Sequence, residues 1–387
     1  MVERLASEGA GGWDVLFEAW QASRRGEDVI ILAVGDPDFH TPEPIIDVAV
    51  DALRSGDTHY AEISGRSELR EVIAARFSAQ TGRDWGPEHV TPFSGTQQAL
   101  FAASLCLLEA GDEVIAFDPM YLTYDATLQA GGAKLTRLSL DADAGFRIDA
   151  DVLADAINPA TRAVVLTTPN NPTGAVASVE ELESVAELAR ANDLWVIADE
   201  VYSDLVFEGR HTSITALEGM ADRTVTVSSL SKSHAMTGWR IGWAIAPPDL
   251  VRHFGNLCLA MNYGIPGFIQ TAAVAALTTQ DAAVADMRDI YRRRRDLASA
   301  ELAGIDGVTV LTPQAGMYVM VDVRGLPTSD EGFAWDLYRA TGVAVVDAAG
   351  FGVASEGWLR LAFTISDEDV VEGCRRLKHY ITNLQTP

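Results

Sequence analysis

The chain has 387 residues, with 29 Lys and Arg against 55 Asp and Glu, which gives a formal net charge of −26 at pH 7. So acidic a surface repels nucleic-acid phosphates and anionic lipid head groups, which argues against both as main partners. The length and the 48% hydrophobic content predict one large α/β domain or two domains with ample core. Lysine occurs only as Lys134, Lys232 and Lys378, so a mechanism that needs a lysine amine has three candidates.

Membrane, export and metal signals are weak in this sequence. The longest uncharged apolar run, residues 99–108, is about half of the roughly 20 residues that a membrane helix needs. The N-terminus lacks a basic segment followed by an apolar one, so no signal peptide is expected. Cys106, Cys258 and Cys374 are far apart, and the seven histidines show no ligand spacing. We therefore expect a cytoplasmic protein with no metal site.

Apolar β-branched runs alternate with amphipathic stretches through the middle of the chain, a pattern typical of parallel strands joined by helices. A helix is expected over residues 97–109, and Ser178 with Glu181 has the spacing of a capping box that opens another. Strands are predicted over residues 113–117, 163–168, 194–198 and 224–227. Polar residues follow these strands, at the sheet edge where α/β proteins bind ligands: Asp118, Asn171, Asp199 and Ser228.

The pattern changes after Pro266. We expect one long helix over residues 267–303, a strand over 318–323 and a terminal helix over 367–384. This organisation predicts a large domain at 45–285 and a small C-terminal domain at 286–387. The segment 1–44 is too short for a domain and is predicted to pack with the small one.

Lys232 is the most promising of the three lysines. It follows a predicted strand among several hydroxyl side chains, with Arg240 eight residues later. Partial burial and nearby positive charge lower the pKa of a lysine, which can then form a Schiff base with an aldehyde. Lys134 lies in an alternating strand pattern and Lys378 on the terminal helix, so we expect both to be solvated surface groups.

Two further groups of residues complement such a lysine. Asp199 directly follows a buried strand, where a carboxylate needs a cationic partner such as a protonated pyridine nitrogen. Tyr202 could then bind a phenolic oxygen of the same ring, although Asp199 fits an N-cap role equally well. The turn at residues 94–97 opens a helix whose free N–H groups favour an anion. Ser229 and Arg240 would add a hydroxyl and a guanidinium for one phosphate.

Four motifs occur together in a characteristic order: Gly-Asp-Pro-Asp-Phe at 35–39, Asn-Asn-Pro-Thr-Gly at 170–174, Asp-Glu-Val-Tyr at 199–202, and Ser-Leu-Ser-Lys at 229–232 with Gly-Trp-Arg at 238–240. They resemble the signature of fold-type I, pyridoxal-phosphate-dependent aminotransferases of the aspartate aminotransferase superfamily. The resemblance implies an α/β fold, with a mainly parallel seven-stranded sheet between helices and a smaller α+β domain. It also implies pyridoxal 5′-phosphate (PLP) as cofactor and a homodimer with shared active sites.

The resemblance assigns a role to each motif residue. Lys232 would form the Schiff base with PLP and move a proton between the substrate Cα and the cofactor. Asp199 would keep the pyridine nitrogen protonated, and Tyr121 would stack on the ring. Other contacts are implied as follows: Tyr202 and Asn171 to the ring oxygen; Gly95, Thr96, Gln97, Ser229 and Arg240 to the phosphate, with Tyr60 from the neighbouring subunit; Arg360, Gly35 and Asn171 to the substrate carboxylate. A surface position for Arg360 remains an alternative.

The wording of residues 58–60, 229–243, 291–295 and 316–318 resembles the arginine:pyruvate transaminase branch of this family. It predicts ping-pong transfer from arginine, or another amino acid with a long side chain, to a 2-oxo acid such as pyruvate. Glu62, Asp14 and Glu18 are candidate guanidinium partners, and each also fits a solvated carboxylate. An aspartate or aromatic aminotransferase and a PLP-dependent β-lyase are the alternatives on the same scaffold.

Overall fold

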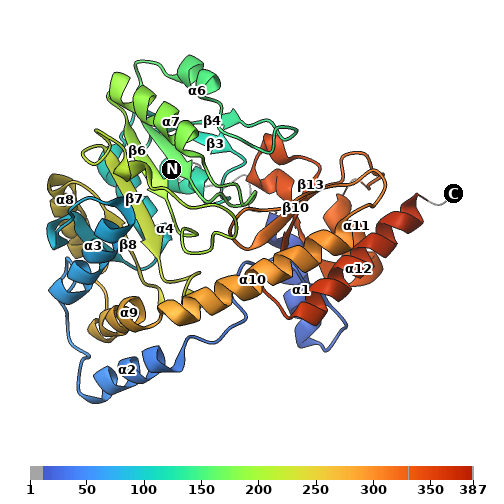
Figure 1. The fold of residues 1–387 in the computed structure, drawn as a ribbon, viewed down its shortest axis with the longest axis horizontal. Helices are drawn as coiled ribbons and strands as arrows, with labels where there is room; N and C mark the ends of the chain where they lie inside the picture. Colours follow the sequence, from blue (N-terminus) through green and yellow to red (C-terminus); the bar gives the residue numbers. More distant parts are fainter. Residues whose placement is uncertain (1–11, 330, 386–387) are drawn as a thin grey trace.

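The computed structural model describes residues 12–329 and 331–385. Its largest feature is a seven-stranded sheet (Figure 1). The strands of this sheet are β2 (Val90–Phe93), β3 (Glu113–Asp118), β4 (Lys134–Ser139), β5 (Thr161–Thr167), β6 (Trp195–Asp199), β7 (Thr224–Ser229) and β8 (Gly242–Ile245). They lie in the order β2-β8-β7-β6-β5-β3-β4. Only β8 runs antiparallel to its neighbours, so the sheet is mainly parallel, as predicted.

Helices cover both faces of this sheet because successive side chains of a strand point to opposite faces. On one face, α4 (Thr96–Leu107) and α8 (Pro248–Met261) pack in a core with Val225 and Val227. On the other, α7 (Val179–Ala191) packs in a core with Val164 and Leu166. The remaining helices and turns of this part are α2 (Glu43–Arg54), α3 (Ser67–Thr81), α5 (Tyr124–Leu128), α6 (Ala150–Ala156), α9 (Gly267–Thr279), η3 (Pro87–His89), η4 (Ile214–Ala216) and η5 (Thr237–Trp239).

A second, smaller region lies at the other end of the molecule (Figure 1). Its antiparallel sheet has the order β12-β13-β10-β9. The strands of this sheet are β9 (Thr309–Leu311), β10 (Tyr318–Asp322), β12 (Val346–Asp347) and β13 (Trp358–Ala362). The helices of the region are α10 (Asp281–Leu302), α11 (Phe333–Thr341) and α12 (Asp367–Leu384), with the short turns η6 (Ala348–Phe351) and η7 (Val353–Ser355). From the N-terminal segment, α1 (Asp14–Arg24) contributes Val15 and Ala19 to the core of this region. In addition, β1 (Ile30–Ile31) pairs with β11 (Val343–Ala344). The predicted boundaries at 44/45 and 285/286 stay predictions.

Several predicted elements match the structure, and one does not. The terminal helix has the predicted bounds, and the capping box of Ser178 and Glu181 forms at the start of α7. The long helix predicted over 267–303 is wrong, because it is interrupted at Gln280 between α9 and α10. The hydroxyls of Thr278 and Thr279 bond back to helix carbonyls at 2.8 Å. Such side-chain bonds favour helix ends and bends, although no proline or glycine marks this position.

The parallel register brings three strand ends to one edge of the large sheet. Thr167 at the end of β5 pairs with Asp199 at the end of β6, and Asp199 pairs with Val227 of β7. The segment that follows Ser229 therefore leaves the sheet beside Asp199. Parallel strands place their carboxyl ends together in this way, and open α/β sheets bind their ligands there.

Candidate active site

The amine of Lys232 lies at this edge, against the N-terminal segment. Its Nζ donates a hydrogen bond to the backbone oxygen of Gly35 at 2.5 Å. A Cβ added at Gly35 would lie 1.9 Å from the hydroxyl oxygen of Tyr318, so only glycine fits at this position. Two segments almost 200 residues apart thus meet at the lysine amine.

The other two lysines lie elsewhere. Lys134 on β4 is largely exposed and forms an ion pair with Glu113 at 3.2 Å, which agrees with its predicted surface position. Lys378 on α12 is half-buried, and its Nζ donates to the backbone oxygen of Glu301 at 3.2 Å. Lys378 is therefore tied from α12 to the backbone of α10 and is less exposed than Lys134.

Arg360 on β13 is fully buried, so a surface position is wrong for this residue. Its Nη1 donates to Oδ1 of Asn171 at 3.0 Å, and its Nη2 donates to the backbone oxygen of Ala33 at 2.9 Å. The Cζ atom lies 4.1 Å from the ring centroid of Tyr318 and 5.6 Å from that of Trp13. Aromatic faces attract a guanidinium, so these rings hold the group flat. Two of its five N–H donors are used, which leaves donors for a carboxylate.

Tyr202 and Tyr318 form a buried pair beside these groups, with their hydroxyl oxygens 3.2 Å apart. Burial opposes ionisation of Tyr318, but the positive charges of Arg360 and Lys232 outweigh it and lower the pKa of this phenol. Burial and the neighbouring Tyr318 raise the pKa of Tyr202. Either hydroxyl can donate in this pair, and Tyr318 is the more acidic phenol.

Asp199 ends β6 as a buried carboxylate. Burial raises its pKa to about 6, although hydrogen bonds from the hydroxyl of Tyr124 at 2.8 Å and the amide of Val201 at 3.2 Å oppose the rise. The chain continues into a turn rather than an α-helix, so the N-cap role is wrong. A cation opposite Asp199 would restore the charged form of this carboxylate.

A tight cluster of glycines and hydroxyls surrounds the start of α4. Gly95 has a φ of +85°, and a Cβ there would lie 2.3 Å from Nη2 of Arg240. A Cβ at Gly242 on β8 would lie 2.8 Å from the backbone nitrogen of Thr96. Ser229 pairs with Gly242 in the sheet. These close approaches gather helix-start amides, a hydroxyl and a guanidinium at one point, the chemistry that binds a phosphate.

Three further residues that were predicted to contact the cofactor, Gln97, Tyr60 and Tyr121, differ in their surroundings. The side chain of Gln97 is engaged by the hydroxyls of Thr123 at 2.8 Å and Thr127 at 2.6 Å, so only its backbone amide is available at the helix start. Tyr60 has 86% of its surface exposed, and its ring centroid lies 5.4 Å from that of Tyr263. The ring of Tyr121 stands edge-on to that of Tyr124, with centroids 6.1 Å apart.

The three candidate guanidinium partners differ in their surroundings. Asp14 opens α1 and follows Trp13, whose ring lies against Arg360. Glu18 is paired with Arg25 at 3.1 Å. Glu62 lies 4.0 Å from the nearest nitrogen of Arg66 and is largely exposed.

A family model described as aminotransferase class I and II matches residues 27–377. The chain belongs to this family. It is 46% identical over 375 residues to an arginine–pyruvate transaminase, AruH, of Pseudomonas aeruginosa, covering 97% of this chain and 95% of that protein. It is 35% identical to an aspartate/prephenate aminotransferase of Cereibacter sphaeroides, covering 96% and 95%. A solved aspartate aminotransferase of Thermus thermophilus with maleate superimposes with a TM-score of 0.92 at 34% identity, covering 98% and 99%.

Membership of this aminotransferase family confirms the predicted fold and enzyme class, and it implies PLP as the cofactor. The residues present fit that group. The hydroxyl oxygen of Thr96 is buried with no hydrogen-bond partner in the described chain, at the helix start where Gly95 and Gly242 allow Arg240 and the backbone to approach closely. The buried carboxylate of Asp199 suits a pyridinium. Within the described ranges, no group of three His, Cys, Asp or Glu side chains could hold a metal.

Sequence reasoning missed four residues of this aminotransferase site. Tyr124 bonds Asp199, Tyr318 and Trp13 pack on Arg360, and Gly242 makes room for the helix start. The signal available in the sequence was a second tyrosine, Tyr124, three residues after Tyr121. None of the described helices is long and apolar enough to cross a bilayer.

Proposed function

We propose that this aminotransferase moves the α-amino group of an L-amino acid with a long, cationic side chain to a 2-oxo acid such as pyruvate, by a ping-pong mechanism. The observation that carries the proposal is the convergence of a lysine amine, a buried guanidinium and a buried carboxylate on one sheet edge. Lys232 contacts Gly35, Arg360 contacts Asn171, and Asp199 lies beside the end of β7.

The cofactor site is proposed to run from Asp199 to the start of α4. When bound, PLP supplies an electron sink that stabilises negative charge developing on the substrate Cα. Asp199 would hold the proton of the pyridine nitrogen, and Tyr121 would lie on the ring face. Gly95, Thr96, the backbone of Gln97, Ser229 and Arg240 would hold the phosphate. Tyr202 and Asn171 would contact the ring oxygen.

Lys232 is proposed to act as both the amine that binds the cofactor and the base that moves the substrate proton. Its Nζ lies within 2.5 Å of the Gly35 oxygen, which fixes the direction of the amine. Proton transfer needs such positioning before it needs a matched pKa. Tyr318, whose pKa is lowered by Arg360 and Lys232 against burial, lies against Gly35 and hydrogen-bonds Tyr202.

Arg360 is proposed to bind the substrate α-carboxylate. A planar guanidinium matches a carboxylate in a bidentate pair, and burial strengthens that pair. The bonds to Asn171 and Ala33 fix the plane of the group in advance, which limits the entropy lost on binding. The backbone of Gly35 completes this proposed substrate site.

The proposal of a cationic donor is supported by the 46% identity to an arginine–pyruvate transaminase. Of the three acidic candidates, Asp14 follows the residue that packs on Arg360, whereas Glu18 is already paired. Glu62 lies farther from its arginine, 4.0 Å against 3.1 Å, so we favour Asp14 and Glu62 over Glu18 as partners of the donor side chain. The proposal also includes a cytoplasmic homodimer, in which Tyr60 of one chain completes the phosphate site of the other, and the domain division at 44/45 and 285/286.

A screen of amino donors with pyruvate tests the reaction and the donor class together. We expect arginine and lysine to give alanine at least tenfold faster than aspartate does, with the 2-oxo product in equal amount. Aspartate turnover equal to that of arginine would contradict the donor class. Ammonia release without alanine would instead identify a lyase. The Lys232→Ala variant is the control and should lose steady-state turnover in the absence of added amines.

A further inference from the structure

A loop at residues 57–66, here termed the arm, connects α2 to α3 and carries Tyr60 on its outer side. The Tyr60 side chain is 86% exposed, and its ring centroid lies 5.4 Å from that of Tyr263. An aromatic side chain so exposed gains little from its own chain. The arm is nevertheless ordered by polar contacts at both ends.

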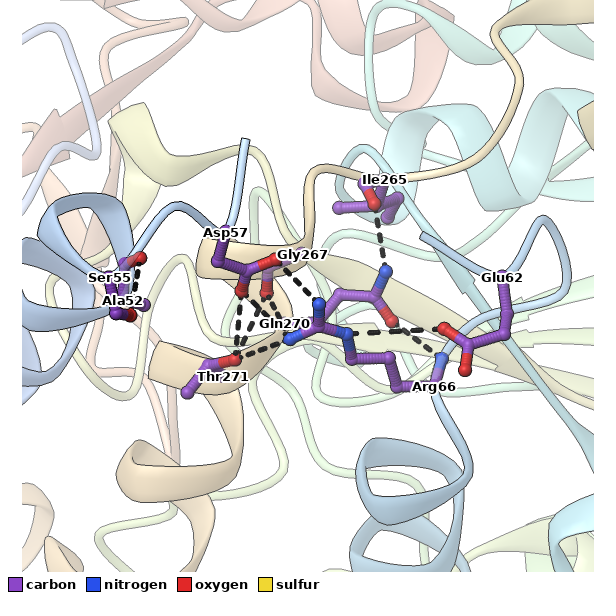
Figure 2. Close-up of polar contacts among 9 residues, drawn as sticks. All are labelled: Ala52, Ser55, Asp57, Glu62, Arg66, Ile265, Gly267, Gln270 and Thr271. Atoms are coloured by element: carbon purple, nitrogen blue, oxygen red, sulfur yellow. Dashed lines mark hydrogen bonds and ion pairs between the residues drawn. The ribbon is translucent and has the colours of Figure 1, made fainter. Parts of the chain in front are cut away.

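The two ends of the arm are joined by a salt bridge (Figure 2). Arg66 Nη2 donates to Oδ1 of Asp57 at 2.6 Å, and Nη1 donates to Oδ2 at 2.9 Å. Both side chains are mostly shielded from solvent, with exposed fractions of 27% for Arg66 and 19% for Asp57. A bidentate, shielded pair fixes geometry more firmly than an ordinary surface ion pair. The arm is therefore closed into a loop of defined shape.

The same guanidinium anchors the arm to α9. Nη1 of Arg66 donates to Oγ1 of Thr271 at 2.7 Å and to the backbone oxygen of Gly267 at 3.3 Å. The backbone N–H of Arg66 donates to Oε1 of the buried Gln270 at 2.8 Å, and Nε2 of Gln270 donates to the Ile265 oxygen at 2.8 Å (Figure 2). Side chain and backbone of one residue thus hold the arm to a helix start some 200 positions later.

We propose that Arg66 is a positioning residue, whose clamp to Asp57 and Thr271 holds the arm so that Tyr60 reaches the cofactor phosphate bound by a second copy of this chain. The inference rests on the proposed function, which assigns Tyr60 to the neighbouring site. Its physical basis is pre-organisation. A free loop would lose conformational entropy when Tyr60 docks, whereas the clamped arm has lost it already.

A double-mutant cycle on PLP affinity tests the inference. PLP dissociation constants are measured by absorbance titration after removal and re-addition of the cofactor. We expect Tyr60→Phe to weaken PLP binding roughly tenfold, the effect of one hydrogen bond to a charged group. Arg66→Ala should weaken it by a similar factor. Because Arg66 acts through Tyr60, the double variant should bind PLP no more weakly than Tyr60→Phe alone.

Matched variants separate positioning from folding. Arg76→Ala removes an arginine within α3, which bonds Asp281 and the Leu277 oxygen away from the arm, and should leave PLP affinity unchanged. Arg66→Lys keeps the positive charge but lacks the planar guanidinium that makes two parallel bonds to Asp57, and should give an intermediate loss of PLP affinity. Thr271→Val removes one clamp contact without touching the charge and should weaken PLP binding slightly. Unchanged PLP affinity in Arg66→Ala, or additive losses in the double variant, would overturn the inference.

Failure of the proposed function gives a different result. If Tyr60→Phe binds PLP as tightly as the parent, or if the active enzyme is monomeric by light scattering, the shared site itself is refuted. If Tyr60→Phe weakens PLP binding in a dimer but Arg66→Ala does not, the shared site stands and the positioning role of Arg66 is refuted.

Discussion

At the scale of single residues, Asp199 has an unusual titration. Burial raises its pKa from an ordinary 3.8 to about 6, against the bonds from Tyr124 and Val201. The difference corresponds to roughly 3 kcal/mol. Between about pH 4 and pH 6 the folded cofactor-free protein holds a proton that the unfolded chain releases. This carboxyl group therefore destabilises the cofactor-free fold increasingly as the pH rises through that window.

Replacing this carboxyl by an amide should remove the penalty. We expect cofactor-free Asp199→Asn to be more stable than the parent at pH 7, by up to roughly 3 kcal/mol, and equally stable near pH 4. Urea unfolding at both pH values measures the difference. Asp204→Asn, at an exposed site in the following turn, is the control for the loss of a carboxyl group as such. An Asp199→Asn protein with the same advantage at both pH values would refute this account.

The position of Lys232 at the sheet edge could be predicted at the residue scale, because composition left three candidate lysines and the sheet pattern separated them. The buried setting of Arg360 could not be predicted, because its partners come from three distant segments: the N-terminal segment, the 170–174 turn and β10. Tyr124 and Asp199 are 75 positions apart and meet only through strand order. The local sequence indicated which side chains could act chemically, whereas the partners that each of them contacts could be identified only from the fold.

At the scale of elements, the close packing of β8 on the start of α4 shapes the proposed phosphate site. The Cβ position at Gly242 is 2.8 Å from both the Gly95 carbonyl carbon and the Thr96 nitrogen. Backbone atoms cannot yield as a flexible side chain can. A larger residue in β8 must therefore displace the turn at 94–97.

Gly242→Ala should for this reason weaken PLP binding, roughly tenfold or more, because the helix-start amides lose their alignment. Absorbance titration of the cofactor-free protein measures the effect. Gly238→Ala is a matched control, because no atom lies within 4 Å of its added Cβ and its backbone is unstrained. Equal PLP affinities for the two variants would show that the turn adapts.

The strands and the terminal helix were predictable as elements because β-branched runs and helical periodicity are local properties. The interruption at Gln280 could not be predicted, because no proline or glycine marks it and the bonds of Thr278 and Thr279 to helix carbonyls are visible only in the structure. The pairing of β1 with β11 joins residues more than 300 positions apart, and nothing in either dipeptide specifies the other.

At the scale of the whole molecule, the net charge of −26 is a source of self-repulsion. Salt shortens the Debye length from roughly 30 Å at 0.01 M to about 10 Å at 0.1 M, which screens this repulsion. We therefore expect the melting temperature to rise by about 2 to 5 °C when NaCl is raised from about 0.01 M to about 0.5 M.

Differential scanning calorimetry of the PLP-loaded protein measures this rise. Tetramethylammonium chloride at equal ionic strength is the control, because screening alone depends on ionic strength and not on the cation. A melting temperature that falls with salt, or that rises with sodium only, would contradict a screening mechanism.

The glycine positions carry a consequence for laboratory evolution of this enzyme. A campaign to change the amino donor would randomise Asp14 and Glu62, which lie on exposed surface where new side chains have room. The Cβ position at Gly35 is already occupied by the Tyr318 hydroxyl, and the one at Gly352 lies 1.9 Å from Oδ1 of the buried Asp118. Libraries should hold these two codons fixed. The least replaceable positions of the catalyst are then ones that have no side chain at all.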